Sequence, residues 1–241
     1  MIGPWAGMQK LAGGPLPQFM PYLGATATSL ILIPGIAVGV NLLLTLRGHQ
    51  AQIVASPSLR FSIAGIVGFL LLGFTGMALN TPTTLKMTQF ALTGYGFEVL
   101  AICGFFSMCA FGGMYFIVPR ITRREWLSRR FIGWHFWLTT YGVLTVVVCS
   151  IMGGLFQGAA QEAYGSSWSD ATSRSYAYNV GTTVAWAFMG LGSSFFLLHL
   201  LLMWARLGRR SQHPTLLDGG HHGQSPHGPD HEVEELQTVE A

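Results

Sequence analysis

Residues 104–140 read GFFSMCAFGGMYFIVPRITRREWLSRRFIGWHFWLTT, and this stretch decides the fold of the chain. Two apolar runs flank a basic segment that contains five arginines. Guanidinium groups are costly to bury in hydrocarbon, so the basic segment must lie at a membrane surface while the apolar runs enter the lipid. The stretch therefore predicts two membrane-crossing helices joined by a basic turn.

The composition of the whole chain is that of a membrane protein. Half of its 241 residues are hydrophobic and only 10% are charged. A helix needs roughly 20 apolar residues to cross a hydrocarbon layer of about 30 Å. Five stretches are long enough, at 22–46, 60–80, 88–118, 131–157 and 178–205. We predict an all-α polytopic membrane protein in which residues 1–210 form a domain of five transmembrane helices.

The basic residues are distributed unequally between the two faces that these five spans define. The ten on one face are Arg47, Arg60, Arg120, Arg123, Arg124, Arg129, Arg130, Arg206, Arg209 and Arg210, and the three on the other are Lys10, Lys86 and Arg174. Positive charge marks the cytoplasmic side of a membrane protein. We therefore expect the N-terminus to lie outside and the C-terminus to lie in the cytoplasm. The loop from Arg120 to Arg130 is interpreted as a topological anchor that contacts lipid headgroups or, alternatively, as a docking site for a partner.

The two ends of the chain differ from its middle. The first fourteen residues lack the basic start and apolar run of a removable signal, so the first helix is expected to direct insertion. Residues 211–241 are rich in His, Gly, Pro and acidic residues and predict a disordered cytoplasmic tail. The histidines of this tail are His213, His221, His222, His227 and His231. Their spacing matches no closed tetrahedral site, so no metal is predicted, although loose binding of a transition metal stays open.

Proline, glycine and tryptophan indicate how the spans kink, pack and end. Pro34 predicts a kink in the first span. Small residues let helices approach closely in lipid; they are Gly35, Gly39, Gly112, Gly113, Gly154, Gly158, Gly190 and Gly192. An aromatic belt at the span ends is predicted from Trp5, Trp134, Trp137, Trp168 and Trp204. Cys103, Cys109 and Cys149 are expected to be packed apolar groups without a disulfide.

Three ionisable side chains fall within the predicted spans and are the candidate functional residues. Glu98 is expected to be neutral unless a cation or a hydrogen bond stabilises it. It is interpreted as a hydrogen-bonded group in a protein interface, as a contact that fills the space of an absent cofactor, or as a proton-transfer station. His135 and His199 lie at similar depth near the cytoplasmic surface. They are candidates for a bis-histidine haem site or for hydrogen-bonding anchors.

The sequences MYFIVPR (residues 114–120), HFW (135–137) and GGLFQG (153–158) together resemble the C-terminal part of the catalytic subunit I of cbb3-type haem-copper oxidases. The resemblance extends over residues 16–207 and implies that the chain corresponds to the last five helices of a twelve-helix subunit. The related nitric oxide reductase large subunit is the second candidate, because LTGYGFEVLAICGFF (92–106) fits the equivalent helix of that family as well.

The resemblance also implies where haem ligands would lie. In the oxidase family a His-x-His pair on the third of these helices ligates two haems, and gapless alignment puts Phe97 and Val99 at those positions. Neither side chain can donate electrons to iron. No catalytic residue, metal or cofactor is therefore predicted for the isolated chain, and whether it is part of an enzyme stays open.

The function that follows is an accessory or structural component of a respiratory electron-transfer complex. Expected partners are the lipid bilayer and other respiratory subunits, such as cytochrome c-type or oxidase subunits. Nucleic acid is not expected, because the net charge of +3 comes from membrane-flanking arginines. The alternative is a redox-active oxidase or nitric oxide reductase subunit. It would bind haem through non-standard ligands or complete a split subunit I. A third possibility is a proton or small-solute pathway that uses Glu98.

Overall fold

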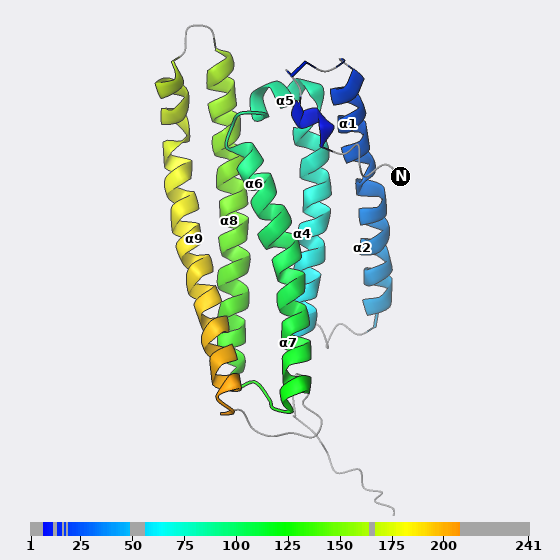
Figure 1. The fold of residues 1–241 in the computed structure, drawn as a ribbon, viewed down its shortest axis with the longest axis vertical. Coiled ribbons are helices and arrows are strands. Elements are labelled where there is room, and N and C mark those ends of the chain that lie inside the picture. The colour runs from blue at the N-terminus through cyan, green and yellow to red at the C-terminus, as the bar shows by residue number, and fades with distance from the viewer. Residues whose placement is uncertain are drawn as a thin grey trace, which may run out of the picture.

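The computed structural model describes residues 7–11, 14–15, 17, 19–48, 56–163 and 167–207. Every regular element in these ranges is a helix. The helices form five spans that are long and apolar enough to cross a membrane, and these run side by side along the long axis of the molecule (Figure 1). The predicted all-α fold with five transmembrane helices is confirmed. The histidine-rich tail and Trp5 lie outside the described residues.

The five spans differ in how many helices build them. The first consists of α1 (Phe19–Leu30) and α2 (Leu32–Leu46), and the second is α4 (Pro57–Leu79). The third passes through α6 (Thr93–Val99), the π-helix η3 (Leu100–Ser107) and α7 (Met108–Thr122), and the last two are α8 (Arg129–Glu162) and α9 (Trp168–Trp204). Two short helices, η2 (Met8–Leu11) and α5 (Pro82–Thr88), lie at one end of the bundle (Figure 1). The opposite end, where α7 and α9 end and α8 begins, is called the arginine-rich end.

The first span is interrupted where Pro34 predicts a kink. Proline lacks an N–H and its ring clashes with the carbonyl four residues earlier, which here belongs to Leu30. The α-helix accordingly stops at Leu30 and resumes at Leu32. A turn at Ile31, whose N–H donates to the Thr28 carbonyl oxygen at 3.3 Å, joins the two pieces. The helix is thus interrupted three residues before Pro34, in the region where a kink is predicted.

The fifth span begins ten residues earlier than the apolar run suggests, at Trp168 and not at 178. Ser167 and Asp170 form a capping box: the Asp170 N–H donates to Ser167 Oγ at 3.2 Å, and the Ser167 N–H donates to Asp170 Oδ2 at 3.1 Å. This arrangement satisfies two backbone donors that a helix start leaves free. The first turns of α9 are polar, so hydropathy does not detect them. The helix is therefore longer than its apolar run.

The third span also differs from the expected run of 88–118. Thr88 ends α5, and a turn separates it from Thr93, where α6 begins. Side chains hold this turn, because Thr88 Oγ1 donates to the Leu79 carbonyl oxygen at 3.1 Å and the Leu92 N–H donates to Gln157 Oε1 at 3.2 Å. The hydrogen bond from Leu92 ties the start of the third span to α8.

Close helix packing depends on glycines, although two of the glycines expected from the sequence, Gly113 and Gly190, have open space beside them. A Cβ added at Gly68 of α4 would overlap the backbone carbonyl of Gly104 in η3, so these two backbones touch. Gly142 of α8 is in similar contact with Met189 of α9, and Gly35 of α2 faces Phe69 of α4. The first and third spans therefore pack on α4, while α9 packs on α8.

Candidate functional site

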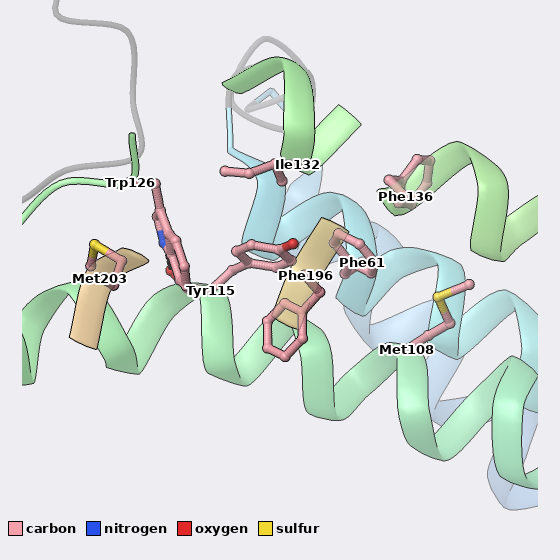
Figure 2. Packing of buried hydrophobic residues seen from close by; sticks show 8 residues of the cluster. All are labelled: Phe61, Met108, Tyr115, Trp126, Ile132, Phe136, Phe196 and Met203. Atoms are coloured by element: carbon pink, nitrogen blue, oxygen red, sulfur yellow. Dashed lines mark hydrogen bonds between the residues drawn. The ribbon is translucent and has the colours of Figure 1, made fainter. Parts of the chain in front are cut away.

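Aromatic side chains from four spans and the basic turn gather near the arginine-rich end. The buried residues of this aromatic cluster are Phe61, Met108, Tyr115, Trp126, Ile132, Phe136, Phe196 and Met203 (Figure 2). Tyr115 stacks on Phe61 with ring centroids 5.1 Å apart, and Trp126 meets the edge of Tyr115 at 5.1 Å. The cluster therefore joins α4, α7 and α9 to the turn that precedes α8.

Trp126 completes a hydrogen bond that a proline removes. Pro119 lies inside α7 and has no N–H, so it cannot pair with the carbonyl of Tyr115 four residues earlier. The Trp126 indole N–H donates to that carbonyl oxygen at 3.2 Å. Although Trp126 lies among charged residues in the sequence, only 8% of it is exposed. The basic turn is therefore fixed to α7 by one buried side chain.

His199 fixes the same turn to α9. The imidazole is fully buried, and its Nε2 accepts a hydrogen bond from the Ser128 N–H at 3.1 Å. Ser128 directly precedes the first residue of α8. The ring packs against Trp126 with centroids 5.0 Å apart. His199 thus acts as a hydrogen-bonding anchor between the start of α8 and the end of α9.

His135 is equally buried but has a different partner. Its Nδ1 lies 2.8 Å from Tyr115 Oη, a hydrogen bond between α8 and α7. The imidazole is surrounded by rings, with centroid distances of 4.5 Å to Phe111, 5.0 Å to Phe61 and 5.3 Å to Phe196. Within the described part of the chain, His135 Nε2 and His199 Nδ1 have no hydrogen-bond partner.

The packing of the two histidines does not fit a haem held between them. Bis-histidine ligation needs two imidazoles directed at one iron from opposite faces of a porphyrin. Here one nitrogen of each ring is engaged by Tyr115 or Ser128, and phenylalanine and tryptophan rings cover the imidazoles. Among the described residues, no group of three or more His, Cys, Asp or Glu is placed to hold a metal ion. The two imidazoles are therefore packed as hydrogen-bonding groups of the helix interfaces.

Phe97 and Val99, which the resemblance aligns with the haem-ligand positions of the oxidase family, contact different neighbours. The Phe97 ring fits against Gly76 of α4, where an added Cβ would lie 3.3 Å from Phe97 Cε2. It also lines a cavity of about 110 Å³ between the first span and α4. Val99 is buried on another side, in a cluster with Val143 and Val146 of α8 and Met189 of α9. Both positions are thus occupied by packed hydrocarbon.

Glu98, between these two residues, is not a buried group in a helix interface. Its side chain is 63% exposed, and Oε1 lies 3.7 Å from Nζ of Lys10 in η2. The same ammonium lies 5.9 Å above the Phe97 ring centroid. Of the conditions expected from the sequence, pairing with a cation is the one observed. Glu98 and Lys10 line a cavity of about 270 Å³ with Asn80, Thr88 and Thr93.

Replacing Glu98 with glutamine should change the free energy of unfolding by less than about 1 kcal/mol, because exposed ion pairs contribute little. Reversible unfolding in mixed detergent, followed by circular dichroism, measures this change. Lys10→Gln is the matched variant and should have the same small effect. A loss above about 2 kcal/mol in Glu98→Gln alone would mean that the carboxylate has a further partner.

Other residues behave partly as the sequence indicates. Trp134, Trp137, Trp168 and Trp204 are all exposed near helix ends, which agrees with an aromatic belt. The three cysteines are free. The sequence reasoning missed Tyr115, Trp126 and Ser128. Pro119 signals that the backbone carbonyl of Tyr115, four residues earlier, needs a hydrogen-bond donor from outside the helix. The sequence does not identify Trp126 as that donor.

The chain has five helices that can cross a membrane, and an aromatic cluster joins four of them at one end. These features define a polytopic integral membrane protein. A family model described as Cytochrome C and Quinol oxidase polypeptide I matches residues 1–205, and the chain belongs to this family.

Among its relatives, the chain is similar to the cytochrome c oxidase subunit 1 homolog of Azorhizobium caulinodans, with 26% identity over 161 residues that cover 66% of this chain and 29% of the relative. It is 25% identical to cytochrome c oxidase subunit 1 of Rhodobacter capsulatus over 223 residues, or 88% of this chain and 41% of the relative. It is also 26% identical to the cbb3-type cytochrome c oxidase subunit CcoN1 of Stutzerimonas stutzeri over 155 residues, which are 64% of this chain and 33% of the relative.

The resemblance to cbb3-type subunit I is therefore confirmed. The matched region spans between 29% and 41% of the length of these relatives. The activity of these relatives therefore belongs to proteins that are longer than the region matched here.

Proposed function

We propose that this chain is a haem-ligand-less accessory or structural component of a respiratory electron-transfer complex. The observation that carries the proposal is the packing of Phe97 and Val99. In the gapless alignment with the family, the two positions that ligate haem in subunit I hold a phenylalanine packed against Gly76 and a valine in an apolar core. Neither side chain can bind iron, whereas both contribute to helix packing. The scaffold therefore has a role that is separate from haem ligation.

The proposed partners are other subunits of such a complex, of the cytochrome c or oxidase type. The relatives named above are cytochrome c oxidase subunits 1, which supports an oxidase assembly as the setting. We further propose that the chain lies in the bacterial inner membrane with the arginine-rich end in the cytoplasm. The support is the concentration of arginines at that end, since cytoplasmic loops carry an excess of positive charge.

Purification of the tagged full chain from native membranes in mild detergent tests the proposal. Cytochromes or an oxidase subunit should copurify with it, and both should be absent from a mock purification of the untagged strain. A preparation that contains neither would remove the proposed assembly.

The alternative is that the chain completes a haem site built mainly by another polypeptide. The hydrogen bonds of His135 to Tyr115 and of His199 to Ser128 favour this version over haem binding by the chain alone. The alternative requires that the haem spectrum of the purified complex changes when this chain is removed. Replacement of His199 with alanine should leave any such haem band unchanged, because His199 Nε2 already accepts a hydrogen bond from the Ser128 N–H.

A further inference from the structure

Two arginines in an unusual backbone conformation lie at the arginine-rich end. Arg123 ends α7 with φ of 52°, and Arg206 follows α9 with φ of 63°. They are the only residues other than glycine with positive φ in the described ranges. Glycine adopts this left-handed conformation at little cost, whereas a side chain with a Cβ is strained there. Such strain persists where surrounding structure holds it, and it is common at functional sites.

The ends of α7 and α9 meet at these arginines. The guanidinium of Arg124, the neighbour of Arg123, donates to the carbonyl oxygen of Arg206. Both arginines follow helix C-termini, whose partial negative charge attracts cations. Neither Arg123 nor Arg206 has a carboxylate within ion-pair distance in the described part of the chain. Two positive charges therefore lie at one junction, and neither forms an ion pair with a carboxylate of the described residues.

Two hydrogen bonds hold the turn that carries Arg123 against the neighbouring helices. The Trp126 indole N–H bonds to Tyr115, and the Ser128 N–H bonds to the buried His199. These contacts fix the turn to α7 and α9 within five residues of Arg123. Arg123 therefore loses less conformational freedom on binding a ligand than an arginine in a mobile loop would.

Apolar side chains flank the two arginines. Ile121, Trp204 and Leu207 are all exposed, and Trp204 reaches 82%. An exposed indole beside arginines at the end of a membrane-crossing helix is the composition of the headgroup region, where an acyl chain meets a charged group. A ligand with a phosphate and an apolar tail matches this surface, whereas free phosphate or an acidic peptide leaves the apolar side chains uncovered.

We propose that Arg123 and Arg206, with Trp204, form a binding site for one anionic phospholipid. The phosphodiester is held by the two guanidinium groups, which suit phosphate oxygens because each presents a planar fork of N–H donors. The acyl chains lie along Ile121 and Trp204. This site is independent of haem and of the proposed role in a respiratory complex.

Native mass spectrometry of the full chain in detergent tests the site. Dioleoyl phosphatidylglycerol should be retained at least five times more than dioleoyl phosphatidylcholine. The variant Arg123→Gln/Arg206→Gln should lose most of this retention. The control Lys86→Gln/Arg174→Gln removes two charges at the opposite end and should keep it. Equal losses in the two variants would overturn the site, because they would show attraction by net charge alone.

Glycine replacement separates binding from folding. The variant Arg123→Gly/Arg206→Gly relieves two left-handed arginines, so its midpoint of thermal unfolding in detergent should equal or exceed that of the unchanged chain. Its retention of phosphatidylglycerol should nevertheless fall as in the glutamine variant. Glycine variants that unfold early and still retain the lipid would contradict the proposal, since the arginines would then serve only the fold.

Two further arms distinguish other sources of negative charge. Inorganic phosphate at millimolar concentration should not displace the retained phosphatidylglycerol, and displacement would overturn the lipid as ligand. The chain also carries acidic residues after Leu207, including Glu232, Glu234 and Glu235. If phosphatidylglycerol bound only after these three were replaced by glutamine, the arginines would be occupied by the chain itself and the proposal would fail.

Discussion

Gly158→Ala should lower the free energy of unfolding by about 3 kcal/mol, the upper end of the usual cost of overpacking. A Cβ at Gly158 of α8 would overlap the carbonyl oxygen and carbon of Met87 in α5. A backbone carbonyl cannot rotate away as a flexible side chain can, so the helices must separate. Gly154→Ala should have a similar effect, because its Cβ would overlap the N atom of Thr93. Reversible unfolding in mixed detergent measures both changes.

Gly190→Ala is the matched control for this substitution. Gly190 lies within α9 and an added Cβ there meets nothing within 4 Å. Alanine favours a helix over glycine by about 1 kcal/mol, so this variant should be as stable as the unchanged chain or slightly more stable. If Gly158→Ala and Gly190→Ala were equally stable, the close approach of α8 to α5 and α6 would be wrong.

Trp126→Ala should also cost about 3 kcal/mol, the lower end for removing a large buried aromatic side chain. The substitution empties the space between Tyr115 and His199 and leaves the Tyr115 carbonyl without the donor that Pro119 cannot supply. The basic turn should then detach from α7, and the peptide bonds that follow its arginines should become accessible to trypsin. Loss of stability in detergent, together with faster trypsin cleavage between residues 120 and 130, is the expected pair of results.

Trp134→Ala is the control for that experiment, because Trp134 lies in the second turn of α8, close after the basic turn, but is exposed. Its effect on stability should be below about 1 kcal/mol, and trypsin cleavage of the turn should be unchanged. Equal effects of the two tryptophan substitutions would show that the turn does not depend on its buried contact with α7.

The sequence predicts the number of spans because the length of an apolar run is set directly by membrane thickness. It also predicts the interruption near Pro34, which depends only on local backbone chemistry. It misses the start of α9 at Trp168, because a polar turn stabilised by a capping box has no hydropathy signal. Trp126 is missed for another reason, since its burial depends on a contact with Tyr115 eleven residues away.

The candidate site was predictable only in part. The similar depth of His135 and His199 follows from their distance to the span ends, and both lie near the arginine-rich end. Their partners, Tyr115 and Ser128, depend on how α7, α8 and α9 rotate about their axes, which spacing does not specify. The pairing of Glu98 with Lys10 likewise depends on η2, a short helix without an apolar run of its own.

We propose that the chain binds no haem because Phe97 and Val99, which the resemblance aligns with the haem-ligand positions of the family, are hydrocarbon side chains. A reduced-minus-oxidised absorbance spectrum of the purified full chain, combined with quantification of extracted haem, tests it most directly. The account predicts no haem band and no haem in proportion to protein. A stoichiometric, coordinated haem recovered with this chain alone would contradict it.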